Sequence, residues 1–320
     1  MFEPAYLKLL RTGELAEHVR AAYQHLEKCD LCANRCGVNR RTPPHSPRKQ
    51  GEVKGSVCRT GERAVVSSFN PHFGEESPLV GSDGSGTIFF SRCNLRCQYC
   101  QNYEISQLGA GTEVEPEEIA AMMLHLQSSG CHNINFVSPS HIVAPILAAT
   151  LIAAQAGLRV PIVYNTCGYD SPEALALLDG VIDIYMPDMK YADAEIARKY
   201  SKIRDYPAIN RAAVKEMHRQ VGDLQMDERG VALRGLLVRH LILPGDLAGT
   251  REIVRFLAQE ISPNTYLNLM DQYRPCYKAD EHPELTRRIT REEYGRAVQW
   301  AEEFGLTRLD ERVPLRLVWL

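Results

Sequence analysis

Three cysteines stand within eight residues of one another, at Cys93, Cys97 and Cys100. They follow an apolar run, residues 86–90, that predicts a strand, so they should lie on a loop leaving the end of that strand. Thiolates packed this closely suit an iron–sulfur cluster or zinc. A cubane cluster bound by three cysteines keeps one iron without a protein ligand, and that iron can accept a substrate or a cofactor.

Two other interpretations of this group remain open from the residues alone. Cysteines can cluster by chance as small buried side chains. Three cysteines can also belong to a zinc site whose fourth ligand is distant in the chain. The tight spacing and the preceding strand favour the iron–sulfur cluster.

The other cysteines of the chain divide into a second group and three scattered residues. Ten cysteines in a reducing compartment are better explained as metal ligands than as disulfides. The second group has the spacing of a four-thiolate site for zinc or a second iron–sulfur cluster, and consists of Cys29, Cys32, Cys36 and Cys58. Cys131, Cys167 and Cys276 are interpreted as packing residues, although Cys167 follows a predicted strand.

Composition bounds the class of protein. The chain has 320 residues, of which 44% are hydrophobic, enough for one large α/β domain and an appendage. Its 37 basic and 40 acidic residues give a formal charge of −3, which argues against a dedicated nucleic-acid or anionic-membrane binder. We expect a cytoplasmic protein, since no apolar run is long enough to span a bilayer and residues 1–11 lack a signal-peptide pattern.

Residues 40–51, between the third and fourth cysteines of the second group, are rich in proline and positive charge. This composition predicts an exposed loop. A basic loop beside a metal site could touch nucleic acid, but a solvated insertion is the interpretation we favour.

The elements that position these cysteines alternate between strands and helices from Gly84 onward. The predicted strands are residues 87–90, 133–137, 160–165, 181–186, 235–243 and 266–270. The predicted helices after them are residues 113–128, 141–156, 171–178, 192–200, 208–221, 248–260 and 291–304. Residues 1–28 predict one or two amphipathic helices that serve packing.

Six β–α units require a parallel sheet with right-handed crossovers, as a partial barrel or as a doubly wound sheet. We divide the chain into a helical and cysteine-rich extension (1–83), a core (84–305) and a C-terminal tail (306–320). In such folds, ligands collect at the carboxyl ends of the strands. Residues directly after each strand are therefore the candidates for the site.

The cysteine motif resembles that of the radical S-adenosylmethionine (SAM) superfamily, in which Cys-x3-Cys-x-aromatic-Cys holds a [4Fe-4S] cluster. Tyr99 fills the aromatic position. The continuation Gln101-Asn102-Tyr103 is similar to the group around pyruvate formate-lyase activating enzyme, and most of all to its PflX-like iron–sulfur relatives. The resemblance implies a partial (β/α)6 TIM-type barrel over residues 84–305, a [4Fe-4S] cluster and SAM.

The same resemblance implies which residues meet SAM, beside Tyr99 in the motif. Ser138 and Ser140 stand where the superfamily has a stretch that binds the SAM amino group, and Asn165 replaces an acid of the activating enzymes. Asp188 and Lys190 match a stretch that holds the ribose, the carboxylate or a nearby cation. Two residues apart on a strand, these last two should face the same way.

Arg239 resembles the family arginine that meets SAM. An arginine inside so apolar a strand requires an anionic partner, such as the SAM carboxylate. We expect His141 to cap the next helix. Residues 268–274 should line the substrate side, with a smaller expectation for His72, Glu75 and Glu76.

The resemblance predicts a radical SAM enzyme that cleaves SAM reductively to a 5′-deoxyadenosyl radical, which abstracts hydrogen from a substrate. No catalytic side chain is assigned, because the cofactor carries the chemistry. The expected partners are an electron donor such as flavodoxin or ferredoxin and a glycyl radical enzyme as the target. Alternatives are a small-molecule or other macromolecular target, an iron–sulfur electron carrier without SAM cleavage, and a zinc-dependent nucleic-acid binder, which the charge balance disfavours.

Overall fold

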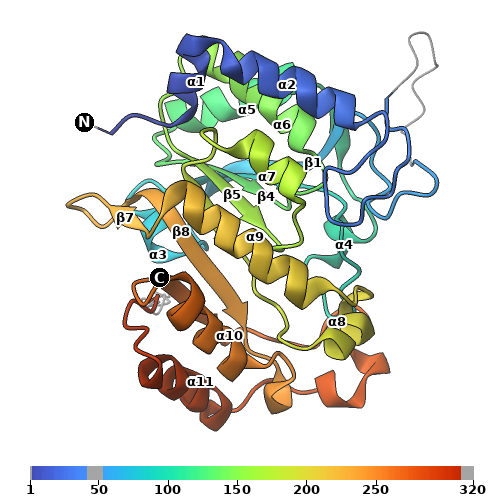
Figure 1. Cartoon of the computed structure of the whole chain (residues 1–320), viewed down its shortest axis with the longest axis vertical. Coiled ribbons are helices and arrows are strands. Elements are labelled where there is room, and N and C mark those ends of the chain that lie inside the picture. Colours follow the sequence, from blue (N-terminus) through green and yellow to red (C-terminus); the bar gives the residue numbers. More distant parts are fainter. Residues whose placement is uncertain (1, 42–52, 311–320) are drawn as a thin grey trace, which may run out of the picture.

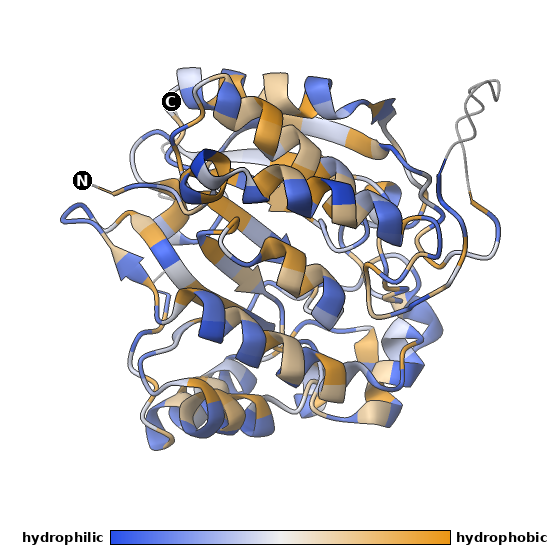
Figure 2. Cartoon of the chain, turned by 45° about the horizontal axis from the view of Figure 1, so that its top comes forward, coloured by the Kyte–Doolittle hydropathy of each residue, from blue (hydrophilic) through white to orange (hydrophobic). Residues whose placement is uncertain are grey.

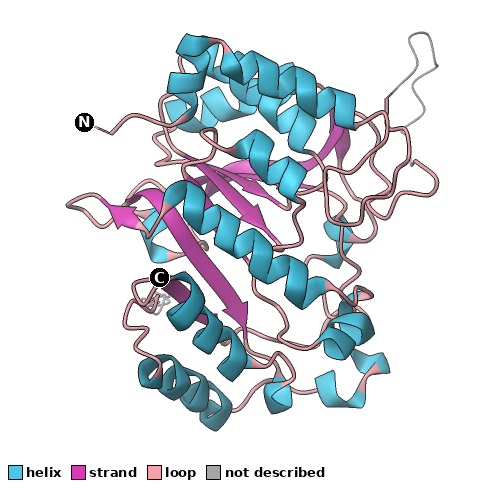
Figure 3. Ribbon diagram, in the orientation of Figure 1, coloured by secondary structure: helices cyan, strands magenta, loops and turns pink. Residues whose placement is uncertain are grey.

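Six parallel strands form the centre of the molecule, seen in a computed structural model that describes residues 2–41 and 53–310 (Figures 1 and 3). They are β2 (Ser85–Phe90), β4 (Ile134–Val137), β5 (Ile162–Thr166), β6 (Ile184–Pro187), β8 (Ala232–Leu241) and β9 (Tyr266–Met270). Each pairs in parallel with the next along the chain. All six predicted strands are therefore present, with shifts of up to three residues at their ends.

The order of these strands decides between the two predicted architectures. A doubly wound sheet reverses its strand order at a switch point. Here the order runs β2-β4-β5-β6-β8-β9 without reversal, and within the described residues β9 pairs with β8 but not with the strands at the far edge. The sheet is thus an open, mostly parallel one, and the predicted α/β partial barrel is confirmed.

Three antiparallel strands extend the sheet and were not predicted. They are β1 (Ala64–His72), β3 (Thr112–Val114) and β7 (Gln225–Met226). β1 pairs with β2 and with β3, and β7 pairs with β8. The outer half of β1 is exposed, so it lacks the apolar pattern that marks a buried strand.

Helices surround the sheet, and the longer ones cover its outer face. They are α1 (Tyr6–Thr12), α2 (Glu14–His25), α3 (Ser77–Val80), α4 (Tyr103–Ser106), α5 (Pro116–Ser128), α6 (Val143–Gln155), α7 (Pro172–Leu178), α8 (Ala194–Ser201), α9 (Tyr206–Val221), α10 (Thr250–Phe256) and α11 (Arg291–Glu303). A capping box of Glu115 and Glu118 begins α5, three residues later than predicted, because residues 112–114 pair as β3 instead. No helix within the described residues has the length and apolarity needed to cross a membrane.

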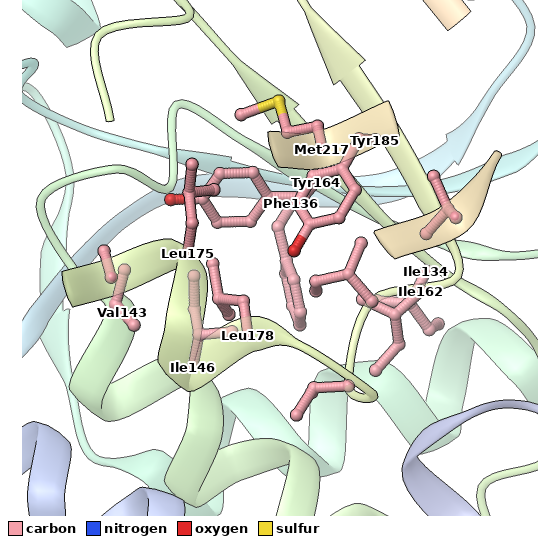
Figure 4. Packing of buried hydrophobic residues seen from close by; sticks show 14 of the residues in the cluster. Ile134, Phe136, Val143, Ile146, Ile162, Tyr164, Leu175, Leu178, Tyr185 and Met217 are labelled. Carbon is pink, nitrogen blue, oxygen red and sulfur yellow. The ribbon is translucent and has the colours of Figure 1, made fainter. Parts of the chain in front are cut away.

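The main hydrophobic core lies between the sheet and these helices (Figure 4). Phe136, Tyr164 and Tyr185 point outward from neighbouring strands and pack with side chains of α6, α7 and α9. Residues one position away, such as Val163 and Ile184, form a separate cluster on the inner face. Figure 2 shows that the helices carry both hydrophobic and hydrophilic residues, as expected for helices with one buried side and one exposed side.

The N-terminal helices α1 and α2 lie against α6 and belong to the main core (Figure 1). The hydroxyl of Tyr6 donates to the carbonyl of Val160 at 2.9 Å, and the backbone N–H of Ala5 donates to Asp183 at 2.8 Å. These helices have the predicted packing role. The division at residues 83 and 305 stays a prediction, and residues 311–320 of the predicted tail lie outside the described residues.

Candidate functional site

The three clustered cysteines lie on a loop that leaves the carboxyl end of β2, as predicted. The loop is held at its start, where the N–H groups of Ser91 and Arg92 donate to the carbonyls of Val65 and Ile105. Beyond it lies a cavity of about 140 Å³. This cavity is lined by Cys93, Leu95, Cys97, Cys100, Asn102, Ile105, Ser106, Gln107, Val137, Ser138, Asn165, Thr166, Cys167, Asp188, Lys190 and Arg239.

Each of the three thiols has a hydrogen-bonding neighbour. Cys93 Sγ accepts from the Leu95 N–H at 3.4 Å, Cys97 Sγ lies 3.0 Å from a serine hydroxyl of α8, and Cys100 Sγ lies 3.1 Å from one in α4. A hydrogen bond from Cys167 is the largest effect on the pKa of Cys93, lowering it to about 7 against the cost of burial. Burial raises the pKa of Cys97 to about 12. Of these two thiols, Cys93 has the lower pKa.

These residues fit a [4Fe-4S] cluster. Its cysteines must face one space from one loop, which the cavity shows for Cys93, Cys97 and Cys100. Within the described ranges, no three side chains of His, Cys, Asp or Glu converge on a single metal ion. The fit thus rests on the donor set and on the shared cavity.

Tyr99, the aromatic residue of the motif, packs away from this cavity. It is buried, and its ring meets the rings of Tyr191 and Tyr273 edge-on, with centroids 6.4 and 5.8 Å apart. These rings belong to a second hydrophobic cluster that includes Leu95 and Cys97. Tyr99 therefore supports the cysteine loop, and a direct contact with the cofactor stays a prediction.

The stretch after β4 contributes one residue to the cavity rather than two. Ser138 lines it, with φ at +63° and its N–H donating to the carbonyl of Asn165 at 2.9 Å. Ser140 is buried, and its hydroxyl lies 2.8 Å from that of Thr166. A contact of either serine with SAM stays a prediction, and Ser138 has the better position for it.

His141 neither caps the next helix nor lines the cavity. Helix α6 has no side-chain cap, and His141 Nε2 lies 3.2 Å from the carbonyl of Ser91, where the cysteine loop begins. Burial lowers the pKa of His141 to about 3, so the ring is neutral and can donate this bond. His141 thus ties the stretch after β4 to the cysteine loop.

Asp188, Lys190 and Arg239 form one buried charged network at the cavity wall. Asp188 accepts from Lys190 Nζ at 2.7 Å and from Arg239 Nε at 2.9 Å. Arg239 Nη2 also donates to Asn165 Oδ1 at 2.7 Å. Burial opposes the charge of Asp188, but Arg239 and Lys190 hold its pKa below the ordinary value.

The anionic partner expected for Arg239 is thus partly supplied by the chain. Asp188 and Asn165 take up Nε and Nη2, and Nη1 lies 4.0 Å from a carboxylate oxygen of Glu76. Asn165 stands where the activating enzymes have an acid, and it faces the guanidinium of Arg239. The positive charge that faces Asn165 is therefore the guanidinium of Arg239.

Glu75 and Glu76, which follow β1, lie beside Arg239 inside the barrel. Asn268 of β9 donates to Glu76 Oε1 at 2.9 Å, while Glu76 Oε2 and both polar atoms of Asn135 have no hydrogen-bond partner within the described residues. Burial, and then the charge of Glu76, raise the pKa of Glu75 from its ordinary 4.5 to about 7. The sequence had indicated these acids only as polar residues of a turn that precedes the first predicted strand.

The loop after β5 carries Cys167 into the cavity, whereas a packing role was the favoured prediction. Cys167 Sγ donates to Asn94 Oδ1 at 3.1 Å. Gly168, with φ at +73°, follows it, and a Cβ there would lie 2.1 Å from Asn210 Nδ2 and 2.4 Å from the carbonyl oxygen of Asp188. Only glycine fits this position, which packs the loops after β5 and β6 against α9.

Four further polar residues of the cavity were not predicted. Thr166 is the last residue of β5, so the rule that ligands gather at strand ends could have found it. Asn102 belongs to the continuation of the cysteine motif, whereas no pattern in the sequence distinguishes Ser106 and Gln107, on and beside the short helix α4.

The second cysteine group lies next to the cysteine loop, outside the cavity. Cys29, Cys32 and Cys58 are buried, and Cys36 is half-buried. Asn34 Nδ2 donates to the carbonyl of Asn94 at 2.7 Å, which joins the two regions. Arg40, at the start of the loop predicted to be exposed, is only 3% exposed, and this part of the prediction is wrong because the side chain turns inward to a carbonyl and a thiol. Residues 42–51 of that loop lie outside the described residues.

Comparison with known proteins gives one family. The family model described as the radical SAM superfamily matches residues 87–257. An uncharacterized protein of Methanocaldococcus jannaschii is 31% identical over 308 residues, which is 94% of this chain and 82% of that protein.

Solved structures show weaker likenesses. A radical SAM methyltransferase from Sphaerobacter thermophilus is 14% identical, with a TM-score of 0.47, over 69% of this chain and 64% of that one. HydG, a maturase of the [FeFe]-hydrogenase, is 12% identical, with a TM-score of 0.48, over 70% of this chain and 49% of that one. The chain thus spans less than two thirds of the length of either structure.

Proposed function

Because this chain belongs to the radical SAM superfamily, we propose that Cys93, Cys97 and Cys100 hold a [4Fe-4S] cluster beside a site for SAM. The observation that carries the proposal is that all three thiols line one cavity at the carboxyl ends of parallel strands. When bound, the cluster and SAM supply reductive cleavage of SAM to methionine and a 5′-deoxyadenosyl radical, which removes hydrogen from the substrate.

The side chains of the cavity orient SAM. Lys190 and Arg239 bring positive charge for its carboxylate, and Asp188 holds both of them in place. The hydroxyl and backbone carbonyl of Ser138 can accept from its amino group. The aromatic cluster around Tyr99 lies behind the cysteine loop and keeps water from that side.

For the target, we propose a glycine of a partner protein, as in the activation of a glycyl radical enzyme. This is supported by the resemblance of Gln101–Tyr103 and of Asp188–Lys190 to the activating enzymes and to the PflX-like group. A small molecule is the second candidate, and the observation that favours it is the set of unpartnered polar atoms on Glu76 and Asn135 inside the barrel. The electron donor in either case is a small redox protein such as flavodoxin or ferredoxin.

We propose further that Cys29, Cys32, Cys36 and Cys58 bind a second metal centre, either zinc or a second iron–sulfur cluster. The burial of three of these four thiols supports it.

Anaerobic reconstitution with iron and sulfide tests the proposed function. With SAM and dithionite, the protein should form 5′-deoxyadenosine, and Cys97→Ser should not, while Cys131→Ser, a buried cysteine away from the cavity, should behave as wild type. An intact cluster without 5′-deoxyadenosine would instead identify an electron carrier.

The two targets are separated by adding a candidate glycyl radical enzyme. An electron paramagnetic resonance (EPR) signal of a glycyl radical on the partner supports activation. If 5′-deoxyadenosine forms only with added small molecules and no partner radical appears, the target is a small molecule.

A further inference from the structure

The four N-terminal cysteines lie on a compact turn and on the segment that returns to it, although within the described residues no three of their sulfurs already converge on one ion. The N–H of Cys29 donates to Val38 O and the N–H of Gly37 donates to Cys29 O, both at 2.9 Å. Arg35 and Gly37 have φ values of +42° and +66°, so the chain turns sharply around Cys36. The segment of Cys58 returns to this turn, since the N–H of Val57 donates to Cys36 Sγ at 3.4 Å.

Three of these four sulfurs accept a hydrogen bond from an N–H group. Besides Cys36, Cys32 Sγ accepts from Asn34 Nδ2 at 3.8 Å and Cys29 Sγ accepts from Arg40 Nη1 at 3.4 Å. A neutral thiol is a weak acceptor, whereas a thiolate is stabilised by such donors. These N–H donors suit the thiolate form, which is the form that binds metals, while burial raises the pKa of Cys32 to about 12.

Arg40 gives independent evidence for negative charge here. Its guanidinium is buried and donates to the carbonyl of Gly61 and to Cys29, and within the described part of the chain no carboxylate pairs with it. The ionisable groups in electrostatic range that favour its charge are Cys29, Cys32 and Cys58. A buried guanidinium without an anion is strongly unfavourable, so these sulfurs must provide its counter-charge.

A metal resolves this balance of charges. Four thiolates around a divalent ion carry a net charge of about −2, and one buried arginine offsets half of it. Without the metal, four buried thiolates would repel one another. Arginine and thiolates are therefore compatible in one buried group when a cation lies among the sulfurs.

This group also holds the loop of the first cysteine set. Asn34 donates to the carbonyl of Asn94, and Arg96, between Cys93 and Cys97, donates to the carbonyl of Val57. Cys32 forms an isolated β-bridge with Asp170, which follows the loop after β5. The turn thus contacts the cysteine loop and the neighbouring strand-end loop.

We infer that Cys29, Cys32, Cys36 and Cys58 bind a thiophilic metal centre as thiolates, that Arg40 is its buried counter-charge, and that the bound centre braces the loop carrying Cys93, Cys97 and Cys100. The brace rests on the proposed cluster at that loop, whereas the thiolate centre does not. Its four protein ligands leave no open position, which suits a structural role.

Metal content of the full chain tests the thiolate centre. A variant with Cys93, Cys97 and Cys100 all changed to alanine should retain either one zinc ion or about four irons with matching sulfide per chain. Elemental analysis distinguishes the two metals. A folded triple variant free of both metals would overturn the inference.

Arg40→Gln tests the counter-charge. We expect this variant to lose its N-terminal metal to a competing chelator at a chelator concentration at least about 10-fold below that needed for wild type. Losses of this size are typical of residues that orient metal ligands. Arg40→Lys should recover most of the retention, since it restores the charge. Arg41→Gln is the matched control, because Arg41 is 43% exposed and lies 3.5 Å from Glu62. Retention in Arg40→Gln equal to that of wild type would contradict the role of Arg40.

The brace is tested by iron release from the cluster of the barrel. Cys32→Ser with Cys58→Ser should lose the N-terminal metal, keep the circular dichroism of wild type, and release cluster iron to a chelator several-fold faster. An unchanged rate overturns the brace. If wild type assembles no cluster at the cysteine loop, the proposed function fails and the brace with it, and the triple variant still decides the thiolate centre.

Discussion

The two groups of cysteines lie side by side but are built differently. The sulfurs of the cysteine loop line a cavity that Lys190 and Arg239 also line, and two of them have serine hydroxyls as neighbours. Three of the four N-terminal thiols are buried, and three of the four accept N–H groups. A centre that must admit a ligand needs an open position, whereas a closed set of four protein ligands suits a structural role.

The largest expected effect separates the two groups. Cys97→Ser removes one of the three proposed ligands of the cluster, so 5′-deoxyadenosine formation should fall to background. Cys32→Ser removes one of the four proposed N-terminal ligands, so activity should fall but remain measurable. Chromatographic assay of 5′-deoxyadenosine checks both variants. Equal loss of activity in the two would break the comparison.

A second test concerns the ion pair beside the cysteine loop. Lys190→Met removes the cation paired with Asp188 at 2.7 Å, and a hydrogen bond to a charged group is worth about 1.5–3 kcal/mol. The dissociation constant for SAM should rise by about 10- to 100-fold, as measured by EPR titration of the reduced cluster. Retention of the N-terminal metal should not change. Unaltered SAM affinity would remove Lys190 from the site.

Glu75 makes the open region sensitive to pH. The pKa of Glu75 in the folded protein is about 7, above its ordinary value of 4.5, so the folded state binds the proton on Glu75 more tightly than the unfolded state does. The stability gained from this proton is fully present below pH 4.5 and is lost as the pH rises through 7. Glu75→Gln should therefore raise the melting temperature by a few degrees at pH 8, relative to wild type, and change it little at pH 5. Thermal unfolding at the two pH values measures this. An equal shift at both would show that ionisation of Glu75 is not responsible.

The smallest effect is expected at Cys167, the thiol of the cavity that is outside the motif. Serine can keep the hydrogen bond to Asn94, so Cys167→Ser should retain its cluster and lose less than about threefold in activity, or about 0.7 kcal/mol. Iron content and 5′-deoxyadenosine formation check this outcome. A loss as large as that of Cys97→Ser would show that Cys167 is itself a ligand.

The sequence predicted what depends on short-range pattern. The six parallel strands were found because their residues are apolar, and Cys93, Cys97 and Cys100 because their spacing is specific. It could not predict that Arg40 turns inward, because its neighbours in the chain are polar and its partners are distant in the sequence.

The same limit applies within the barrel. Arg239 could be predicted to need an anion, but its partners Asn165 and Asp188 come from neighbouring strands and are identified only by the register of the sheet. In the exposed half of β1, apolar and polar residues do not alternate, so β1 was not predicted. The positions of Glu75 and Glu76, which follow β1, could therefore not be predicted either. The sequence therefore predicted the individual elements but not the side-chain contacts between them.

The missing methyl group at Gly168 has a mechanical consequence. Asn210 of α9 donates to the carbonyls of Gly168 and Asp188, both at 3.0 Å, so a single amide clasps the two loops. Because both carbonyls accept from the same amide, a shift of one loop is expected to move the other. If a molecule that binds in the cavity displaces Asp188, Cys167 should therefore shift as well, so that two sides of the cavity move together.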